Sequence, residues 1–210
     1  MYLSRIELNT ARRETMQALG SPGMIHGIVE SCFAGERDRR LWRIDKLGEK
    51  TYLLLLSPEQ PQLASIAKQL GYANDSGECA EYDKLLARIE ADQRWRFRLR
   101  ANPVYSKSLG SKEGRGRIYA HVTQAQQKEW LLSRAEKCGF SLSADAFDVV
   151  HTSWEKFKKR ANERREVTIR TATFEGVLTV TNPEIFKKTL VVGIGKEKAY
   201  GCGLITVMRG

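Results

Sequence analysis

The chain has 210 residues, enough for one large domain or for two domains of about 100 residues each. Its 35 Lys and Arg residues outnumber 25 Asp and Glu residues, and the net charge of +10 predicts a polyanionic partner. No apolar run approaches the ~20 residues of a membrane span. Charges also stand in residues 1–7, where a signal peptide has its apolar core, so we expect a cytoplasmic protein with no membrane partner.

The cysteines and histidines do not predict a metal site. No two cysteines form a CxxC pair, and the histidines do not fall at the spacing of metal ligands. We therefore expect no metal and no cofactor. Free thiols are typical of a reducing compartment, and we expect most of them to be buried. The residues concerned are Cys32, Cys79, Cys138, Cys202, His26, His121 and His151.

The N-terminal half alternates between predicted strands and helices. In chain order these are a strand at 2–8, a helix from Ser21-Pro22 to 33, strands at 41–46 and 51–57, a helix opened by the capping box at 57–60, a helix at 78–91 and a strand at 94–100. With the helix at 78–91 set aside, the order is βαββαβ, which is the ferredoxin-like arrangement.

The same order repeats in the C-terminal half. The elements expected are a strand at 117–122, a helix capped by Thr123 and Gln126 and running to about 137, extended segments at 147–157, 166–172 and 174–180, a helix from 182–184 and a last strand at 204–208. The sequence thus predicts an α+β protein with two tandem ferredoxin-like (RRM-like) domains. We place them at 1–101 and 116–210, with a linker at 102–115.

A glycine-rich segment lies between the last predicted helix and the last strand. Its glycines form two Gly-x-Gly units, and lysines stand between them. A Walker-type loop is excluded because Cys202 follows Gly201, and a dinucleotide fingerprint is excluded because Lys198 and Thr206 occupy the places of its third glycine. A tight turn and a loop that holds nucleic-acid phosphate both remain open. The residues concerned are Gly193, Gly195, Gly201, Gly203, Lys196 and Lys198.

The strand at 94–100 alternates arginine with apolar residues. On a strand its four arginines share one face, at intervals of about 6.6 Å, close to the phosphate repeat of a nucleic-acid strand. A solvated charged face is the alternative, but no acidic residue stands among the four. We therefore expect contact with nucleic acid, and weaker binding when Arg96 or Arg98 is replaced. The four are Arg94, Arg96, Arg98 and Arg100.

A second basic concentration lies between two extended segments. Residues 155–170 include seven basic and three acidic side chains, and their position predicts a projecting hairpin that can grip phosphate strands. A solvated turn is the alternative. The candidate RNA-binding residues here are Lys156, Lys158, Lys159, Arg160, Arg164 and Arg165, and Arg115 and Arg117 add to them from the start of the second half.

His26 is the histidine whose chemistry fits RNA best. Its imidazole follows a predicted helix start, and the ordinary imidazole pKa of about 6.5 allows proton transfer near neutral pH. Cleavage of RNA without metal needs a base for the 2′-hydroxyl, an acid for the leaving 5′-oxygen and cations around the phosphate. A core or capping histidine is the alternative interpretation.

Four stretches in order resemble one known family. They are Met-Tyr-Leu-Ser at 1–4, Phe-Arg-Leu-Arg-Ala-Asn-Pro at 97–103, Phe-Glu-Gly-Val-Leu-Thr at 174–179 and the glycine-rich segment at 193–204. Over essentially its whole length the chain resembles the CasE family, the CRISPR repeat-RNA endoribonuclease of the type I-E Cascade complex. The resemblance implies two ferredoxin-like domains and metal-independent cleavage of precursor CRISPR RNA at the base of the repeat hairpin. The products would be a 2′,3′-cyclic phosphate and a 5′-hydroxyl.

The resemblance also implies partners and residue roles. The enzyme would stay on the CRISPR RNA hairpin beside other Cascade subunits, and it would meet target DNA only through the complex. The family's catalytic histidine matches His26, and the basic hairpin would bind the RNA stem. Some members carry a tyrosine where this chain has Gly23, so Tyr2, Tyr200, a lysine or water is the candidate for the second proton transfer. A non-catalytic hairpin-binding subunit, which Gly23 favours, is the alternative. A generic RRM-like chaperone lacks support because the aromatic RNP pattern is absent.

Overall fold

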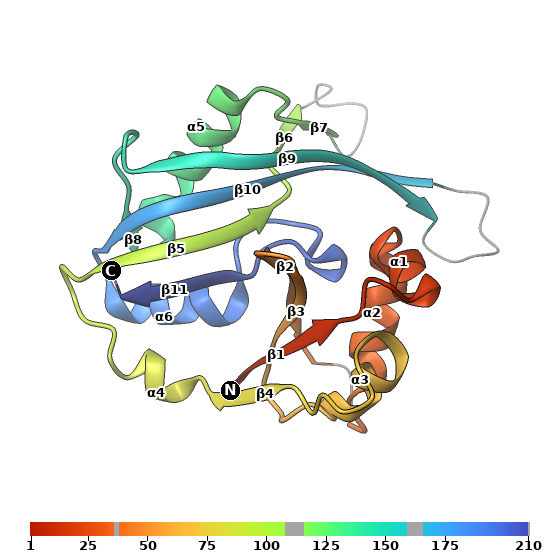
Figure 1. Ribbon diagram of the computed structural model, residues 1–210. Coiled ribbons are helices and arrows are strands. Elements are labelled where there is room, and N and C mark those ends of the chain that lie inside the picture. Colours follow the sequence, from red (N-terminus) through yellow and green to blue (C-terminus); the bar gives the residue numbers. More distant parts are fainter. Residues whose placement is uncertain (36–37, 108–115, 159–165, 210) are drawn as a thin grey trace.

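The computed structural model describes residues 1–35, 38–107, 116–158 and 166–209. Figure 1 shows two antiparallel sheets, one from each half of the chain, with the helices of the first half on the right and a long hairpin above them. Within these ranges no helix is long and apolar enough to cross a membrane.

The first sheet has the ferredoxin-like strand order β2-β3-β1-β4. Three helices, α1, α2 and α3, pack against one of its faces. Ile6 and Leu8 of β1 are buried there against Ile25 and Val29 of α2. The alternation of buried and half-buried residues along β1 follows from the two-residue period of a strand. The elements are β1 (Tyr2–Leu8), α1 (Arg13–Leu19), α2 (Pro22–Ser31), β2 (Leu41–Leu47), β3 (Lys50–Ser57), α3 (Leu63–Leu70) and β4 (Glu78–Glu81).

The second sheet repeats this order with later strands. Its path is β11-β5-β10, and β9 pairs with the other side of β10. Phe97 and Leu99 of β5 pack in one core with Trp130 of α5 and Phe186 of α6. The elements are β5 (Arg94–Ala101), α5 (Gln124–Ala135), β8 (Phe140–Ser141), β9 (Phe147–Lys158), β10 (Glu166–Val180), α6 (Pro183–Val192) and β11 (Ile205–Arg209), with the short helices α4 (Asp83–Leu86), η1 (Glu136–Cys138) and η2 (Lys198–Tyr200). The fold is therefore two tandem ferredoxin-like domains, as predicted.

The assignment of strands to the two halves was wrong at two places. The predicted helix at 78–91 contains β4, which pairs with β1 and completes the first sheet, followed by the short α4. The strand at 94–100 does not close the first half. As β5 it pairs with β10 and β11, so it opens the second half. The sheets therefore divide between β4 and β5, and residue 101 is not the boundary between them.

The strand predicted at 117–122 also has a different role. As β7 (Arg117–Ala120) it pairs with β6 (Val104–Lys107) in a separate two-stranded hairpin, inserted between β5 and α5. The extended segments at 166–172 and 174–180 form one continuous strand, β10. Its partner β9 has a bulge at Val150, because His151 lies opposite Thr173 while Val149 lies opposite Phe174.

Helix starts were predicted with mixed success. The capping box of Thr123 and Gln126 is present at α5, and Asn182 caps α6. The capping box at 57–60 is wrong, because the Ser57 hydroxyl donates to the Glu59 carbonyl and α3 begins later. Helix α1 was not predicted.

One buried arginine joins the two halves. Arg43 of β2 donates to both carboxylate oxygens of Asp45, at 2.8 and 2.7 Å. It also donates to the carbonyls of Arg98 and Leu204 at 2.8 and 2.9 Å, both in the second half. With its side chain only 2% exposed, Arg43 replaces water as the hydrogen-bond partner of these carbonyls.

Candidate functional site

His26 lies where three distant segments meet. It is half-buried on α2, and its neighbours Ile25 and Val29 anchor that helix in the core. Helix α2 packs beside η2 of the glycine-rich segment and approaches β9 of the basic hairpin. Figure 1 shows the glycine-rich segment and the end of the β9–β10 hairpin converging on α1 and α2. The structure therefore places the helix of the candidate histidine beside two of the predicted RNA-binding regions.

The two candidate tyrosines lie in different places. Tyr200 belongs to η2, and its ring makes an edge contact with Phe157 of β9, with centroids 4.7 Å apart. Tyr2 is held in β1 opposite Ser57 and Glu81. It is the first residue of the strand, whose N-terminal end lies on the side away from α1 in Figure 1. The element that carries Tyr200 packs beside α2, so Tyr200 is the better placed of the two.

A cavity of about 420 Å³ opens beside α2. Pro22 and Ile25 of α2 line it, opposite Trp154 and Lys156 of β9. Lys156 is exposed and has no carboxylate partner among the described residues. An ammonium group therefore shares a cavity with the helix that carries His26, which fits the lysine considered as a proton-transfer partner.

The arginine face of β5 points toward the first sheet. The predicted alternation is present, since Trp95, Phe97 and Leu99 are buried on the opposite face. A groove of about 730 Å³ separates the two sheets, and Arg96 and Arg98 line it. These arginines thus face the groove between the sheets, where Arg96 is exposed and Arg98 is half-buried.

Acidic partners come from other strands and divide the four arginines. Arg98 pairs with Asp45 at 3.3 Å and with Glu175 at 2.8 Å. Arg100 pairs with Glu155 and donates to the carbonyl of Gly201 at 2.9 Å. Arg94 and Arg96 are exposed and make no ion pair within the described part of the chain. The absence of local acidic residues did not predict these long-range pairs.

The hairpin of β9 and β10 matches the predicted basic ribbon as far as the structure describes it. Lys156 and Lys158 are exposed at its far end, and Arg117 is exposed on β7. The remaining candidates, Arg115, Lys159, Arg160, Arg164 and Arg165, lie outside the described residues.

The glycines fold their own segment tightly against the protein. All four have positive φ, between 73° and 95°. A Cβ at Gly193 would lie 2.7 Å from the carbonyl of Gly203, and one at Gly201 would lie 2.6 Å from the Trp42 ring. The amide of Gly203 donates to the Arg100 carbonyl at 2.7 Å. A Cβ at Gly203 would lie 3.0 Å from the Ile194 carbonyl, and one at Gly195 would lie 3.2 Å from the Trp130 ring. All four glycines thus serve close packing.

The outward part of the segment runs from Gly195 to Lys198. Lys196 is exposed. Lys198 is half-buried, and burial together with the nearby charge of Arg39 lowers the pKa of its ammonium group. Among the described residues, the amides of Gly195 and Lys196 donate to no backbone carbonyl. The phosphate-binding interpretation of the segment is therefore confined to this short stretch.

The cysteines agree with the expectation of burial only in part. Within the described ranges, no group of three or more His, Cys, Asp and Glu side chains could hold a metal ion. Cys32 and Cys202 are buried, Cys138 is half-buried and Cys79 is exposed. Burial raises the pKa of Cys32 to about 11 and that of Cys202 to about 12. Half of the thiols, and not most of them, are buried.

Sequence reasoning missed a second cavity, formed by the β6–β7 hairpin, α5 and the glycine-rich segment. Tyr105, His121 and Arg134 line it together with Lys196. These residues come from separate segments and form no motif, so only the fold brings them together. The inserted hairpin, read from sequence as an ordinary sheet strand, hid this arrangement.

Comparison with known proteins places this geometry in a family. The family described as "CRISPR associated protein" matches residues 1–209. The CRISPR-associated endoribonuclease Cse3 of Thermus thermophilus is 29% identical over 220 residues, covering 99% of each chain. The Cascade subunit CasE of Escherichia coli is 32% identical over 117 residues, covering 53% of this chain and 56% of that protein.

A solved structure agrees with the sequence match. The structure of Thermus thermophilus Cse3 bound to an RNA representing a pre-cleavage complex has a TM-score of 0.79 and 27% identity. The match covers 99% of this chain and 98% of that one. With the family match spanning both ferredoxin-like halves, the chain belongs to the CasE family of CRISPR-associated proteins.

Proposed function

We propose that this protein binds the hairpin of a CRISPR repeat RNA and cleaves the precursor at the 3′ base of the stem. The observation that carries the proposal is the meeting of α2, η2 and β9, which brings the helix that carries His26 beside two lysine-bearing segments. The end-to-end similarity to a protein named as an endoribonuclease supports the same reaction. After cleavage the protein stays on the hairpin in the cytoplasm as a Cascade subunit, and it meets target DNA only through that complex.

The reaction needs two proton transfers and no metal. A base removes the proton of the 2′-hydroxyl, whose oxygen attacks the adjacent phosphorus. The 5′-oxygen leaves with a proton from an acid, which gives a 2′,3′-cyclic phosphate and a 5′-hydroxyl. His26 serves as one of these groups, because imidazole exchanges protons near neutral pH. Neighbouring cations stabilise the charge that develops on the phosphate.

Gly23 stands where some family members carry a tyrosine, so another residue must make the second proton transfer. Tyr200, on the element beside α2, can offer its hydroxyl, and Lys156 can offer its ammonium group from the shared cavity. An ammonium group also stabilises an oxyanion without giving up its proton. Lys156 therefore supports the reaction in either role.

The RNA stem lies along the basic hairpin in this proposal. Lys156 and Lys158 project from β9, and the candidates at 159–165 continue the same ribbon in sequence. Arg94 and Arg96 supply further positive charge. Phosphate contacts release counterions, so affinity for the hairpin should fall as salt rises.

Replacement of His26 by alanine tests the catalytic assignment. Repeat RNA from the organism's own CRISPR array is incubated with saturating protein in EDTA, and single-turnover cleavage and hairpin affinity are both measured. Wild type should cut in EDTA, and His26→Ala should lower the cleavage rate by about 10²–10⁴-fold with unchanged affinity. His151→Ala, which removes an exposed histidine of β9, is the matched control and should cut normally.

Three results would overturn parts of this proposal. RNA left intact by wild type in EDTA would exclude metal-independent cleavage. Cutting at the normal rate by His26→Ala would remove His26 from the reaction. Equal binding by both proteins with cleavage by neither would favour the alternative, a non-catalytic subunit that caps the hairpin. A 2′-deoxy nucleotide at the scissile position should abolish cutting, because the nucleophile is then missing.

A further inference from the structure

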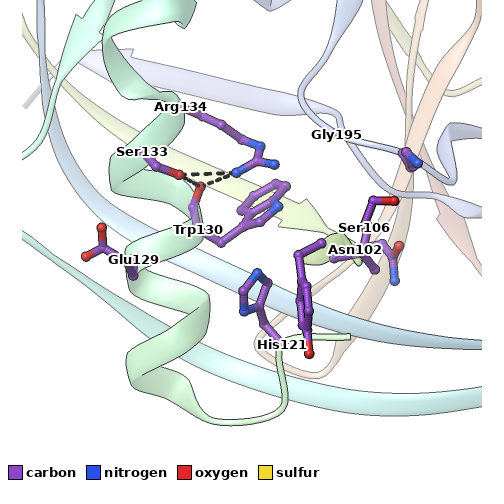
Figure 2. Close-up of a pocket in the computed structure, with 11 residues that line it drawn as sticks. Asn102, Ser106, His121, Glu129, Trp130, Ser133, Arg134 and Gly195 are labelled. Atoms are coloured by element: carbon purple, nitrogen blue, oxygen red, sulfur yellow. Dashed lines mark hydrogen bonds between the residues drawn. The ribbon is translucent and has the colours of Figure 1, made fainter. Parts of the chain in front are cut away.

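The second cavity lies apart from the His26 site. It has a volume of about 510 Å³, within the range of pockets that hold small ligands. Asn102 and Tyr105 line one side, Trp130 and Arg134 of α5 line another, and Gly195 closes it from the glycine-rich segment. Figure 2 shows the side chains of Asn102, Trp130 and Arg134 around a common space.

Three aromatic rings form a series that reaches the cavity, which Tyr105 and His121 line and Tyr119 does not. Tyr105 of β6 stacks on Tyr119 of β7, with centroids 5.7 Å apart and planes inclined by 25°. His121 lies against the other side of this series, 5.0 Å from Tyr105. Tyr105 is 45% exposed and Tyr119 is 40% exposed. Exposed rings beside a cavity are typical of surfaces on which unpaired bases stack.

Arg134 supplies a positive charge without an acidic partner among the described residues. Its guanidinium lies 4.3 Å from the centre of the Trp130 ring, and it donates to the Trp130 carbonyl at 2.9 Å. Desolvation is the main reason why the pKa of Arg134 is lowered, and the nearby thiol of Cys138 opposes that effect. Glu129 is the acidic residue of the lining, and Figure 2 shows its carboxylate pointing away from Arg134. The guanidinium is thus held in place, and it has further N–H groups that can donate to a ligand.

Two further groups can complete the binding of a nucleotide. Lys196 lies on the opposite wall and is exposed. The Nδ1 atom of His121 is buried and has no hydrogen-bond partner in the described part of the chain. Burial, and then the charge of Arg134, lowers the pKa of His121, which favours the neutral ring. A neutral ring stacks on a base and hydrogen-bonds to it without adding charge.

We propose that this cavity binds an unpaired nucleotide that flanks the RNA stem. The base stacks on the rings of Tyr105 and His121, which line the cavity, and the phosphate binds Arg134 and Lys196. The inference rests on the proposed function, since it assigns a second contact to the same RNA. The glycine-rich segment connects the two sites, because Gly195 borders this cavity while η2 lies beside α2. RNA leaving the cleavage site can follow that segment to the stacked rings.

Three RNA probes separate this contact from stem binding. They are the repeat stem-loop alone, the stem-loop with its 5′ flank and the stem-loop with its 3′ flank, each carrying a 2′-deoxy scissile nucleotide. Wild type should bind one flanked probe more tightly than the stem-loop. Tyr105→Ala and Arg134→Gln should each weaken that probe about tenfold and leave the stem-loop unchanged. Tyr105→Phe keeps the ring and should retain the affinity.

Two control variants carry the same kinds of substitution at exposed residues away from the cavity. Tyr72→Ala removes a tyrosine that is 44% exposed, and Arg88→Gln removes an exposed arginine near α4. Both should bind all three probes like wild type.

Two outcomes would overturn the inference. If Tyr105→Ala and Arg134→Gln bind every probe like wild type, the cavity does not hold RNA and is free to receive a protein subunit. If they weaken the stem-loop as much as the flanked probes, the contact is to the stem. Failure of wild type to cut the complete repeat would contradict the proposed function instead, and it is measured separately.

Discussion

The two halves share one topology but contribute different chemistry. Each has a ferredoxin-like sheet, in which the first and third strands of the half lie side by side at the centre. The first half supplies a helix with His26. The second supplies the long β9–β10 hairpin, the aromatic β6–β7 insertion and the glycine-rich segment. Neither half alone contains the proposed site.

This difference shows how two halves with the same fold can have different roles in one protein. In the first half the helices cover one sheet face, and the open face packs on the second half through Leu41 and Leu56. In the second half, the shared elements are extended by the segments that we propose bind RNA. The proposed reaction site lies at the junction, so the contacts that join the halves would also hold that site together. Three predictions test how strong that junction is.

Loss of the buried arginine at the junction should have the largest effect. Arg43→Ala leaves the carboxylate of Asp45, only 6% exposed, with Arg98 as its remaining cation. Removal of one partner of a buried ion pair costs about 3–5 kcal/mol. We expect a loss of that size in the free energy of unfolding, measured by urea denaturation.

Two comparisons sharpen this result. Arg13→Ala, at an exposed arginine of α1, should change stability by less than about 0.5 kcal/mol. Arg43→Ala combined with Asp45→Ala should lose less than Arg43→Ala alone, because no buried carboxylate is left behind. A loss below about 1 kcal/mol for Arg43→Ala would show that the halves do not depend on this link.

Two glycine replacements should have unequal, smaller effects. Gly201→Ala and Gly48→Ala each force a residue with a side chain to positive φ, at 73° and 60°, which costs about 1–2 kcal/mol. Only at Gly201 would the new Cβ overlap another group, the Trp42 ring at 2.6 Å, while nothing lies within 4 Å at Gly48. Overpacking should add about 1–3 kcal/mol at Gly201.

Thermal and urea unfolding of both glycine variants measure the difference between them. Gly201 touches the first half from the second, whereas Gly48 lies in the turn between β2 and β3. Equal losses in the free energy of unfolding at the two positions would mean that the glycine-rich segment adjusts to the added Cβ. The segment would then not hold the halves together.

Thiol labelling should reveal the smallest difference. Cys32 lies in the first half and Cys202 in the second, and both are buried. At pH 8 both stay protonated, because desolvation raises their pKa values to about 11 and about 12. Exposed Cys79 should react with a thiol reagent at once. Cys32 and Cys202 should react slowly and at rates within a few-fold of each other, since the joined halves open as one unit.

The raised pKa values of the same thiols predict that the protein loses stability as pH rises. In the unfolded chain they lose protons near the ordinary value of 9.0, well below their folded pKa values. Their contribution to stability is complete below about pH 9 and is lost as pH rises from there toward 12.

The labelling experiment has a result that would contradict the prediction. Labelling of Cys32 more than tenfold faster than Cys202, measured by mass spectrometry, would show that the halves open separately.

The sequence predicted periodicity well and partners poorly. Alternation correctly placed Arg94–Ala101 in a strand with its apolar face buried. It could not say which sheet the strand joins, because pairing with β10 and β11 depends on residues far along the chain. The same limit applies to Arg98 and Arg100, whose acidic partners lie on other strands.

The candidate site was predicted in its parts, and its assembly required the fold. His26 and the basic hairpin each follow from local residue types. Their meeting depends on α2 packing beside η2 and β9. The second cavity had no local signal, because Tyr105 and Arg134 are ordinary residues until the inserted hairpin lies next to α5. Of the glycines, local sequence could not show that Gly201 serves packing against Trp42.

The length of β10 has a mechanical consequence. Its pairing with β5 begins only at Ala172, so Glu166 to Thr171 pair with β9 alone, and the amide of Asn102 clamps the strand at the Arg170 carbonyl, 2.7 Å away. The ribbon is nevertheless held at more than one point, because Glu155 pairs with Arg100 and the buried Phe157 packs against Tyr200, next to Lys158. A displacement of Lys158 would therefore also move Tyr200, so the basic hairpin and the glycine-rich segment are mechanically coupled.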